Sequence, residues 1–347
     1  MEGKLNSLSH TLILKIESGS GYDALQYFQS FIVRKRKSFN REELSELFFF
    51  AVKLFIDRDS LNNSIALLQW FIKGGAGSDC IFSLNGTTDD LGKLISLLRA
   101  YEINIVAPII EQTYVILNEK FAMSNRAEKV LLQGKMDEFE SLSLSAFEAL
   151  KNWPSAVKAA IKLNKVNVLV RLTHLWASEG YPNEFPLFFA RVVLVLLTEN
   201  KLEQASSFLN DAQFVYADLL GENLTYKSTN DSDAFQFYLT SWHLAIIITE
   251  LISLPSSTRS GVNIKKVEIF SVIYERYASL LDKMDGKIVK ILEKIGEIYF
   301  GFTIYPRGSV GRGLDDGFNP LSILSDVFSG FRNRSNMDNI PLNMSLK

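Results

Sequence analysis

Apolar residues recur along most of this chain at the spacing of an amphipathic helix. The clearest exception is Glu184 to Ala205 (EFPLFFARVVLVLLTENKLEQA), where the positions from Pro186 to Leu197 are apolar on every side except at Arg191. A helix with that pattern has no face that it could expose to water. It is also too short to cross a bilayer, which needs about 20 apolar residues. The pattern therefore predicts a helix, opened by Pro186, that other helices of the same protein bury.

A second pattern joins the helices in pairs. The helix expected over 5–16 ends at Ser18-Gly19 and the next begins at Gly21, so these two helices must lie antiparallel. Comparable joints precede the apolar runs at 65–72, 157–163 and 206–209, and each has a small residue three positions into the second helix. These small residues are Ala24, Ser64, Ala156 and Ala205. We therefore predict an all-α fold, a right-handed α-solenoid of stacked αα-hairpins similar to TPR arrays but with irregular spacing.

Polar interruptions divide the predicted solenoid. The segment 122–138 is the most polar join between apolar segments, and we expect a boundary near Gly134. The predicted organisation is an N-terminal helical half over 1–135, a C-terminal helical half over 136–301 and a tail over 302–347. Pro108 is suited to open a helix in the first half. Gly221 to Asp233 has no helical period and predicts a loop insertion or a small β-hairpin. The last helices are expected over 262–281 and 287–299.

The tail differs in composition from the rest of the chain. After Gly301 it is rich in Gly, Pro, Arg, Asn and Ser, which predicts little structure of its own. One short amphipathic segment interrupts it, long enough to dock into a groove but too short to be a stable helix alone. Its apolar residues are Leu321, Ile323, Leu324, Val327 and Phe328. Docking on the solenoid and docking on another protein are both open at this stage.

Composition narrows the class of protein. A chain of 347 residues with 47% hydrophobic content can bury a large core, and a formal net charge of -2 provides no general attraction to nucleic acid or an anionic membrane. Cys80 is the single cysteine, so an internal disulfide or a multi-cysteine zinc site is excluded. The N-terminal segment lacks a long apolar stretch followed by a small-residue cleavage site, so we expect a cytoplasmic protein.

The residue types that carry catalysis are scattered. The three histidines, His10, His174 and His243, lie on separate predicted helices, and none has a second metal ligand three or four positions away. Cys80 adjoins a glycine-rich loop without the surroundings of a nucleophile. The glycines at 74–77 lack the Lys-Ser/Thr of a phosphate loop. We therefore predict no enzymatic activity, no metal and no cofactor.

One charged feature points to a partner. Arg34-Lys35-Arg36-Lys37 closes the second predicted helix, where cations complement the C-terminal carbonyl groups. That structural role explains part of the pattern, and an acidic partner protein would explain the rest. Lys15 lies on the first helix of the same hairpin, so both could contribute to one basic surface. No aromatic stacking motif accompanies the basic run, which argues against nucleic acid.

Three longer blocks resemble a known family. They are KIESGSGYDALQYFQSF at 15–31, HLWASEGYPNEFPLFFARVVLVLLTENKLEQA at 174–205, and KILEKIGEIYFG at 290–301. Together they make the chain similar, from about residue 12 to residue 331, to the Golgi-to-ER traffic protein 4 family, the adaptors of tail-anchored protein targeting. The last block is the most specific, because packing alone would not dictate IGEIYFG followed by a glycine-rich tail.

The resemblance implies a non-enzymatic adaptor that bridges partners for post-translational insertion of tail-anchored proteins into the ER membrane. In the family the N-terminal half holds the targeting ATPase. The C-terminal half holds a ubiquitin-like partner, which delivers a chaperone, and in animals it also holds a large ubiquitin-like scaffold. Direct insertion of the chain into the membrane is not expected.

The resemblance also implies the residues of the two binding sites. Positions that match the family's ATPase-facing residues are Lys15, Tyr22, Arg34 and Lys37. Positions that map to the ubiquitin-like partner's site are Phe214, Tyr216, Leu224, Tyr226, Phe235 and Tyr238. For this second set, ordinary packing between two helices is an equal alternative.

The chain departs from the family pattern in two places. Asn62-Asn63 stands where relatives commonly have an acidic residue at the start of the fourth helix, which puts one ATPase contact in doubt. The family's Asp-Pro-x-x-His segment is not visible at 125–134. A generic helical-repeat scaffold of another multi-protein complex is therefore the alternative function, since it would share the hairpins and need neither partner.

Overall fold

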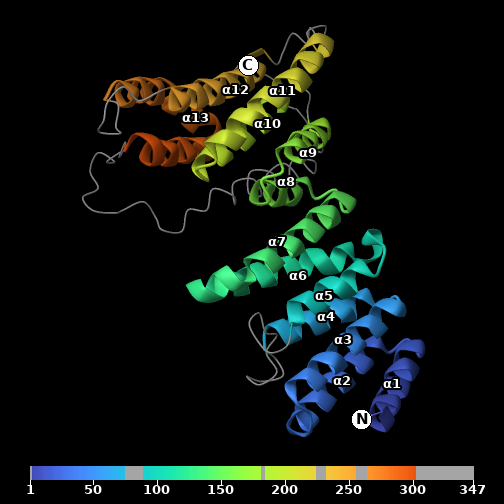
Figure 1. Ribbon diagram of the computed structural model, residues 1–347. Coiled ribbons are helices and arrows are strands. Elements are labelled where there is room, and N and C mark those ends of the chain that lie inside the picture. The colour runs from blue at the N-terminus through green and yellow to red at the C-terminus, as the bar shows by residue number, and fades with distance from the viewer. Residues whose placement is uncertain (1, 75–88, 181–183, 224–231, 255–263, 302–347) are drawn as a thin grey trace, which may run out of the picture. The chain divides into compact units, whose positions relative to one another are not determined.

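The computed structural model describes residues 2–74, 89–180, 184–223, 232–254 and 264–301, and these ranges are helical almost throughout (Figure 1). They contain no strand. The chain forms two compact units, Met1–Asn152 and Trp153–Lys347. The prediction of an all-α solenoid of helical hairpins is confirmed.

The first unit is built from helical hairpins. Its helices are α1 (Glu2–Glu17), α2 (Gly21–Lys35), the short 3₁₀ helix η1 (Arg36–Ser38), α3 (Arg41–Asp57), α4 (Leu61–Ile72), α5 (Asp90–Arg99), α6 (Ile103–Met123) and α7 (Arg126–Ala149). Neighbours in sequence pack together, α1 on α2, α3 on α4 and α6 on α7. In addition α4 packs on α6 and α5 packs on α7, so each hairpin buries its apolar face against the next.

The second unit surrounds one central helix. Its helices are α8 (Trp153–Lys162), α9 (Val166–Ser178), α10 (Phe185–Thr198), α11 (Leu202–Asn223), α12 (Ser232–Ser253), α13 (Ile264–Ile295) and the π-helical turn η4 (Gly296–Phe300). Helix α10 contacts α9, α11, α12 and α13. The isolated apolar stretch of the sequence is therefore the element on which this unit is assembled.

Every residue of α10 is buried, including Arg191, which is 3% exposed. Phe189 lies at the centre of an aromatic cluster, with ring centroids 5.9 Å from Phe208 of α11 and 6.1 Å from Trp242 of α12. Phe185 stacks on Phe189 from the same helix at 5.2 Å. The all-round burial that the sequence predicts for this helix is confirmed.

The small residues at the start of each second helix are completely buried. Ala24, Ser64, Ala156 and Ala205 are each 0% exposed. A larger side chain at these positions would force the two helices of the hairpin apart, because protein interiors have little free volume. The spacing read from the sequence therefore marks real close approaches between helices.

Several joints between consecutive helices share one backbone geometry. At the first joint Gly19 has φ 80°, the N–H of Ser20 donates to the carbonyl of Lys15 at 3.0 Å, and the N–H of Gly19 donates to that of Ile16 at 3.0 Å. This double hydrogen bond satisfies carbonyl groups that the end of a helix would leave unpaired. The same arrangement, with positive φ at the central residue, recurs at Asp59, Lys151, Asn164 and Asn200.

Helix α13 returns on itself. The Tyr274 hydroxyl donates to Glu293 Oε1 at 3.0 Å, although 19 positions of a straight helix would separate them by about 28 Å. Phe270 also stacks on Phe300 of η4, with ring centroids 4.6 Å apart. The two ends of this element therefore lie side by side, as the two helices expected over 262–281 and 287–299 would.

The structure differs from the sequence expectations at several boundaries. Pro108 lies inside α6, which opens five residues earlier at Ile103, so the prediction that proline opens this helix was wrong. Gly134 lies within α7, and the two compact units divide between Asn152 and Trp153. A glycine in a helix costs only about 1 kcal/mol relative to alanine, which a 24-residue helix packed on α6 tolerates.

The expected insertion at 221–233 is shorter than predicted. Residues 221–223 continue α11 and residues 232–233 begin α12, while 224–231 lie outside the described residues. The predicted tail, with its amphipathic segment at 321–328, also lies outside them.

Candidate protein-interaction site

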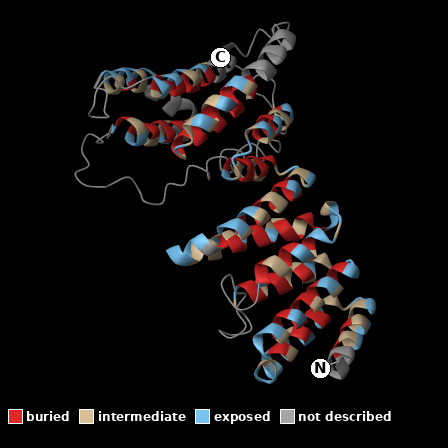
Figure 2. Ribbon diagram, viewed as in Figure 1, coloured by how far each residue is buried: buried red, intermediate tan, exposed pale blue. Residues whose placement is uncertain are grey.

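The outer face of α2 carries large side chains that the core does not use. Ala24, Leu25, Phe28 and Ile32 form its buried side. On the opposite side Tyr22 is 64% exposed and Val33 is 51% exposed. An exposed tyrosine and valine on one helix, with cations at its C-terminal end, form a surface typical of a protein contact. Figure 2 shows the alternation of buried and exposed residues along the helices of this unit.

The first pair of predicted ATPase-facing residues lies at the start of α2. Lys15 in the last turn of α1 places its Nζ 5.8 Å from the centroid of the Tyr27 ring, close enough for a cation–π contact. Tyr22 accepts a hydrogen bond from Gln26 Nε2 at 2.7 Å. This contact holds the phenol along the outer face of the helix.

The second pair lies at the opposite end of the same helix. Arg34 is exposed in the last turn of α2, and Lys37 is exposed in η1. Twelve residues separate Tyr22 from Arg34, which corresponds to about 18 Å along the helix axis. Tyr22 and Arg34 therefore lie in the first and last turns of α2, while the Lys15 ammonium lies beside Tyr27 near the middle of the helix.

The turn that carries Lys37 is fixed by its neighbours. The Phe31 and Phe39 rings approach to 6.2 Å across η1. Asn40 then opens α3 with a capping box, in which its side chain accepts from the Glu43 N–H at 2.8 Å and its own N–H donates to the Glu43 carboxylate at 2.8 Å. The basic end of the hairpin is therefore held on a defined backbone.

The start of α4 adjoins the start of α2. A Cβ atom added to Gly21 would lie 2.6 Å from Asn63 Nδ2, so these segments touch beside Tyr22. Asn63 donates to Ser60 Oγ at 2.8 Å, whereas Asn62 is exposed. Of the two asparagines that depart from the family pattern, Asn62 is thus the one directed to the surface.

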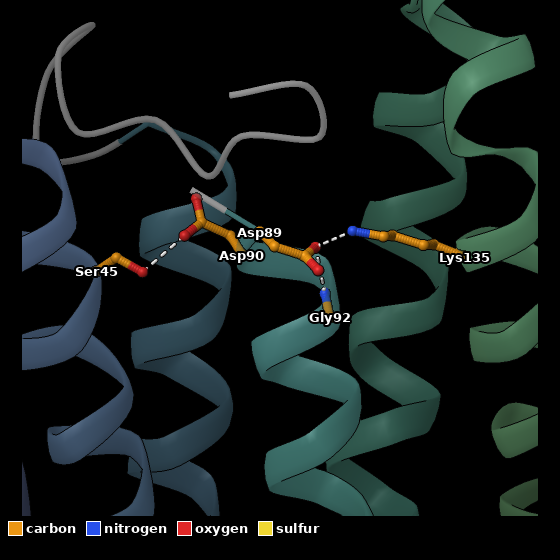
Figure 3. A network of polar contacts seen from close by, with 5 residues as sticks. All are labelled: Ser45, Asp89, Asp90, Gly92 and Lys135. Atoms are coloured by element: carbon orange, nitrogen blue, oxygen red, sulfur yellow. Dashed lines mark hydrogen bonds and ion pairs between the residues drawn. The ribbon is translucent and has the colours of Figure 1, made fainter. Parts of the chain in front are cut away.

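A polar network inside the first unit was missed by the sequence reasoning. Figure 3 shows two neighbouring carboxylates at the start of α5 that point to different helices. Asp90, 1% exposed, accepts from the Ser45 hydroxyl of α3 at 2.6 Å. Asp89 caps α5 by accepting from the Gly92 N–H at 3.0 Å and forms an ion pair with Lys135 of α7. An Asp-Asp pair before a helix is a capping signal in sequence, but its long-range partners are not visible there.

Lys120 of α6 interacts electrostatically with Asp90 of this network. Its ammonium group donates to the Ile72 carbonyl at the end of α4 at 3.3 Å. Burial lowers the pKa of Lys120 to about 8, although the Asp90 carboxylate raises it and Arg41 lowers it further. For Asp89, burial alone would raise the pKa, but the contacts with Lys135 and Gly92 leave the net pKa below its usual value.

Tyr114 and Glu140 form a second polar contact between α6 and α7. The Tyr114 hydroxyl donates to Glu140 Oε1 at 2.6 Å, and Glu140 is 5% exposed. Burial and the adjacent carboxylate both raise the pKa of this tyrosine. The Asp90–Ser45 and Tyr114–Glu140 contacts are buried between helices and align them, whereas the Asp89–Lys135 ion pair lies at the surface.

The predicted site for a ubiquitin-like partner falls mostly outside what can be described. Phe214 and Tyr216 belong to α11, and Phe235 and Tyr238 belong to α12, but the side chains of these four residues are not described. Leu224 and Tyr226 lie outside the described residues. This site therefore stays a prediction.

The residues considered for catalysis are not assembled. His10 and His243 are exposed, and His174 packs edge-on against Phe185 with ring centroids 5.7 Å apart. Across the described part of the chain, no group of His, Cys, Asp or Glu has the arrangement of a metal site. Cys80 lies outside it.

Comparisons with known proteins address the chain as a whole. The profile of the family described as Golgi to ER traffic protein 4 matches residues 146–321, just over half of the chain. The crystal structure of C. therm. Get4 is similar over 99% of this chain and 99% of that chain, with a TM-score of 0.55 and 15% sequence identity, which speaks for the fold alone. No curated protein matches. None of the helices described above combines the length and apolar character needed to span a membrane.

Proposed function

We propose, from the premise that this chain belongs to the Golgi to ER traffic protein 4 family, that it is a non-enzymatic cytoplasmic adaptor in tail-anchored protein targeting. It uses two separate surfaces. The first unit binds the targeting ATPase, and the second unit binds a ubiquitin-like partner that delivers a chaperone. The ATPase receives its tail-anchored client beside that chaperone, and no covalent step, metal or cofactor is involved.

The observation that carries the ATPase contact is the outer side of the first hairpin. It combines Tyr22, which is 64% exposed and whose hydroxyl accepts a hydrogen bond from Gln26, with the exposed cations Arg34 and Lys37 at the other end of α2. Aromatic and arginine side chains on a rigid element are the usual energetic centre of an interface. The side of α2 from Tyr22 to Arg34 extends over about 18 Å, which suits an elongated partner surface with acidic residues better than a point-like anion.

The second surface is proposed from family membership. The family profile covers α8 to η4, which make up the described part of the second unit. The hairpin of α11 and α12 carries the candidate residues near its joint. A large ubiquitin-like scaffold is a further candidate partner for this unit.

Charge reversal tests the ATPase contact. Arg34→Glu with Lys37→Glu should weaken binding of the full chain to the targeting ATPase at least about tenfold at low salt, since attraction becomes repulsion. The loss of affinity should be smaller at about 0.15 M salt than at about 0.01 M salt, because the screening length falls from about 30 Å to about 8 Å. Titration calorimetry at both salt concentrations measures this.

A matched control is available in the second unit. Lys162→Glu with Lys165→Glu makes the same change of charge at the end of α8, with Lys162 likewise in the last turn of its helix. This variant should bind the ATPase like the parent. If both double variants bind the ATPase as the parent does at low salt, the first hairpin is not the contact, and a generic scaffold becomes the better reading of the fold.

A further inference from the structure

Helix α13 carries an exposed stripe that no element of the described chain covers. Lys265, Ile269, Val272 and Arg276 follow one another at spacings of four, three and four residues and are all exposed. Ile269 is 48% exposed and Val272 is 65% exposed. The order is cation, two β-branched apolar residues, cation, along about 16 Å of helix. An apolar pair between two cations is a surface for an amphipathic segment with acidic flanks.

The described chain leaves the fold beside this stripe. Phe270 stacks on Phe300 at 4.6 Å, and Gly301, the last described residue, follows directly. Gly301 has φ 61°, in the left-handed region that favours glycine, and its N–H donates to the Gly296 carbonyl. The backbone thus ends the π-helical turn sharply, next to the level of α13 that carries Ile269.

The sequence that follows has the complementary character. From 313 to 330 it contains no Lys or Arg, while Asp315, Asp316 and Asp326 give it three negative charges. Asn319-Pro320 is a favourable start for a helix, with Asn at the capping position and Pro in the first turn. The apolar residues Leu321, Leu324 and Phe328 then share one face, with Val327 beside it.

The segment can reach the stripe easily. Twenty residues lead from Gly301 to Leu321, and a flexible linker of that length spans roughly 25 Å on average. A tethered segment of this kind is present at an effective concentration of about millimolar. Even a weak contact is therefore populated in cis, although an isolated eight-residue helix would not be stable.

We propose that residues 320–328 dock on the α13 stripe of the same chain, with Leu324 and Phe328 against Ile269 and Val272. Lys265 and Arg276 at the ends of the stripe attract the aspartates of the segment. Glu268 and Glu275 are exposed along one border of the stripe and repel those aspartates, and Lys266, which donates to the Ile252 carbonyl at 3.1 Å, lies toward the other border. The acidic side of the segment therefore faces away from the two glutamates, which fixes its orientation. This contact is independent of the proposed ATPase site, because it lies in the second unit.

Disulfide trapping in the full chain tests the contact. In a Cys80→Ser background, Val272→Cys combined with Leu324→Cys should form an intramolecular disulfide under mild oxidation. The matched control replaces Val272→Cys by Ile247→Cys, at a position on α12 of the same unit that is 40% exposed. The α13 pair should close at least about tenfold faster than the α12 pair, because docking raises the local concentration. Adding Ile269→Asp should bring the rate down to that of the control.

Two results would overturn the proposal. Equal closure rates for both pairs would mean that the segment does not favour the stripe. Disulfides found only between two molecules would mean that a second copy, not the chain's own tail, covers it.

Hydrogen exchange provides a readout without added cysteines. The amides of 321–328 should exchange about tenfold more slowly in the parent than in Val272→Asp, because docking protects a segment that would otherwise open freely. Val130→Asp, an equally exposed substitution in the first unit, should leave the exchange of this segment as in the parent. Unprotected exchange of 321–328 in the isolated parent chain would contradict docking. This holds even if a partner protein binds the stripe in a complex.

Discussion

The described residues of the two units bury hydroxyls and large apolar side chains alike, but they bury different charged groups. Between the helices of the first unit lie carboxylates and hydroxyls, with Asp90 1% exposed against Ser45 and Glu140 5% exposed against Tyr114. In the second unit the central helix α10 is enclosed by apolar surface, and Arg191 is the charged residue among its fourteen.

This difference illustrates two ways in which the positions of packed helices are determined. A buried polar pair requires its partner, so it selects one register between helices and is costly when broken. An apolar core is held by shape and tolerates moderate change, but it supplies most of the free energy of folding. Both units have an apolar core, and the first adds buried carboxylate contacts between its helices, so its helix positions should respond more strongly to changes of carboxylate charge.

Truncation of the apolar centre should have the largest effect. Phe189→Ala removes the ring that contacts Phe185, Phe208 and Trp242, and should lower the free energy of unfolding of the second unit by about 3–5 kcal/mol. Urea unfolding followed by circular dichroism and tryptophan fluorescence measures it. Tyr22→Ala, an aromatic truncation on the exposed side of α2, should change stability by less than about 0.5 kcal/mol. Comparable losses in the two variants would contradict the description of α10 as the centre of its unit.

Replacement of a strained joint residue should have a smaller effect, of opposite sign. Lys151 has φ 54° at the joint that ends the first unit, a conformation that a lysine side chain disfavours. Lys151→Gly should raise the free energy of unfolding by about 1 kcal/mol. Asn200→Gly, at φ 56° in the second unit, should gain less, since asparagine tolerates this region. Thermal unfolding of both variants measures these changes. A neutral or destabilising effect of Lys151→Gly would contradict backbone strain at this joint.

The pH dependence of the first unit sharpens the comparison further. Burial lowers the pKa of Lys120 in the folded chain to about 8, from the usual lysine value of 10.5. The unfolded state therefore binds more protons between these values, so the stability contributed by this group is lowest below pH 8 and rises as the pH increases toward 10.5. Asp90→Asn removes the carboxylate that raises this pKa and should move the Lys120 titration below pH 8. NMR titration of the lysine side-chain signals measures the Lys120 pKa in the parent and in Asp90→Asn. A midpoint near 10.5 in the parent would be incompatible with burial of the Lys120 ammonium group.

The sequence was sufficient for the features that depend on local patterns. The run at 186–197, apolar except at Arg191, predicted the central helix, and the small residues Ala24, Ser64, Ala156 and Ala205 predicted close approaches that the structure contains. Period and residue size decide these features within one or two turns of helix.

Features that depend on distant partners were not accessible. Asp90 and Ser45 lie 45 positions apart, and the tie between Lys120 and this network requires three helices to be in place. The sequence also suggested one basic surface from Lys15 to Lys37. The structure places the Lys15 ammonium beside Tyr27, near the middle of α2, and Arg34 in the last turn of that helix, so the shared basic surface stays a prediction.

Separate binding of the two units tests the proposed adaptor most directly. Residues 1–152 and 153–347, the two compact units, are each mixed with the targeting ATPase and with the ubiquitin-like protein and run on a size-exclusion column at low and moderate salt. We expect the first fragment to co-elute with the ATPase alone, more weakly as salt increases, and the second with the ubiquitin-like protein alone. Co-elution of the ATPase with 153–347, or of neither partner with either folded fragment, would contradict the two-surface adaptor.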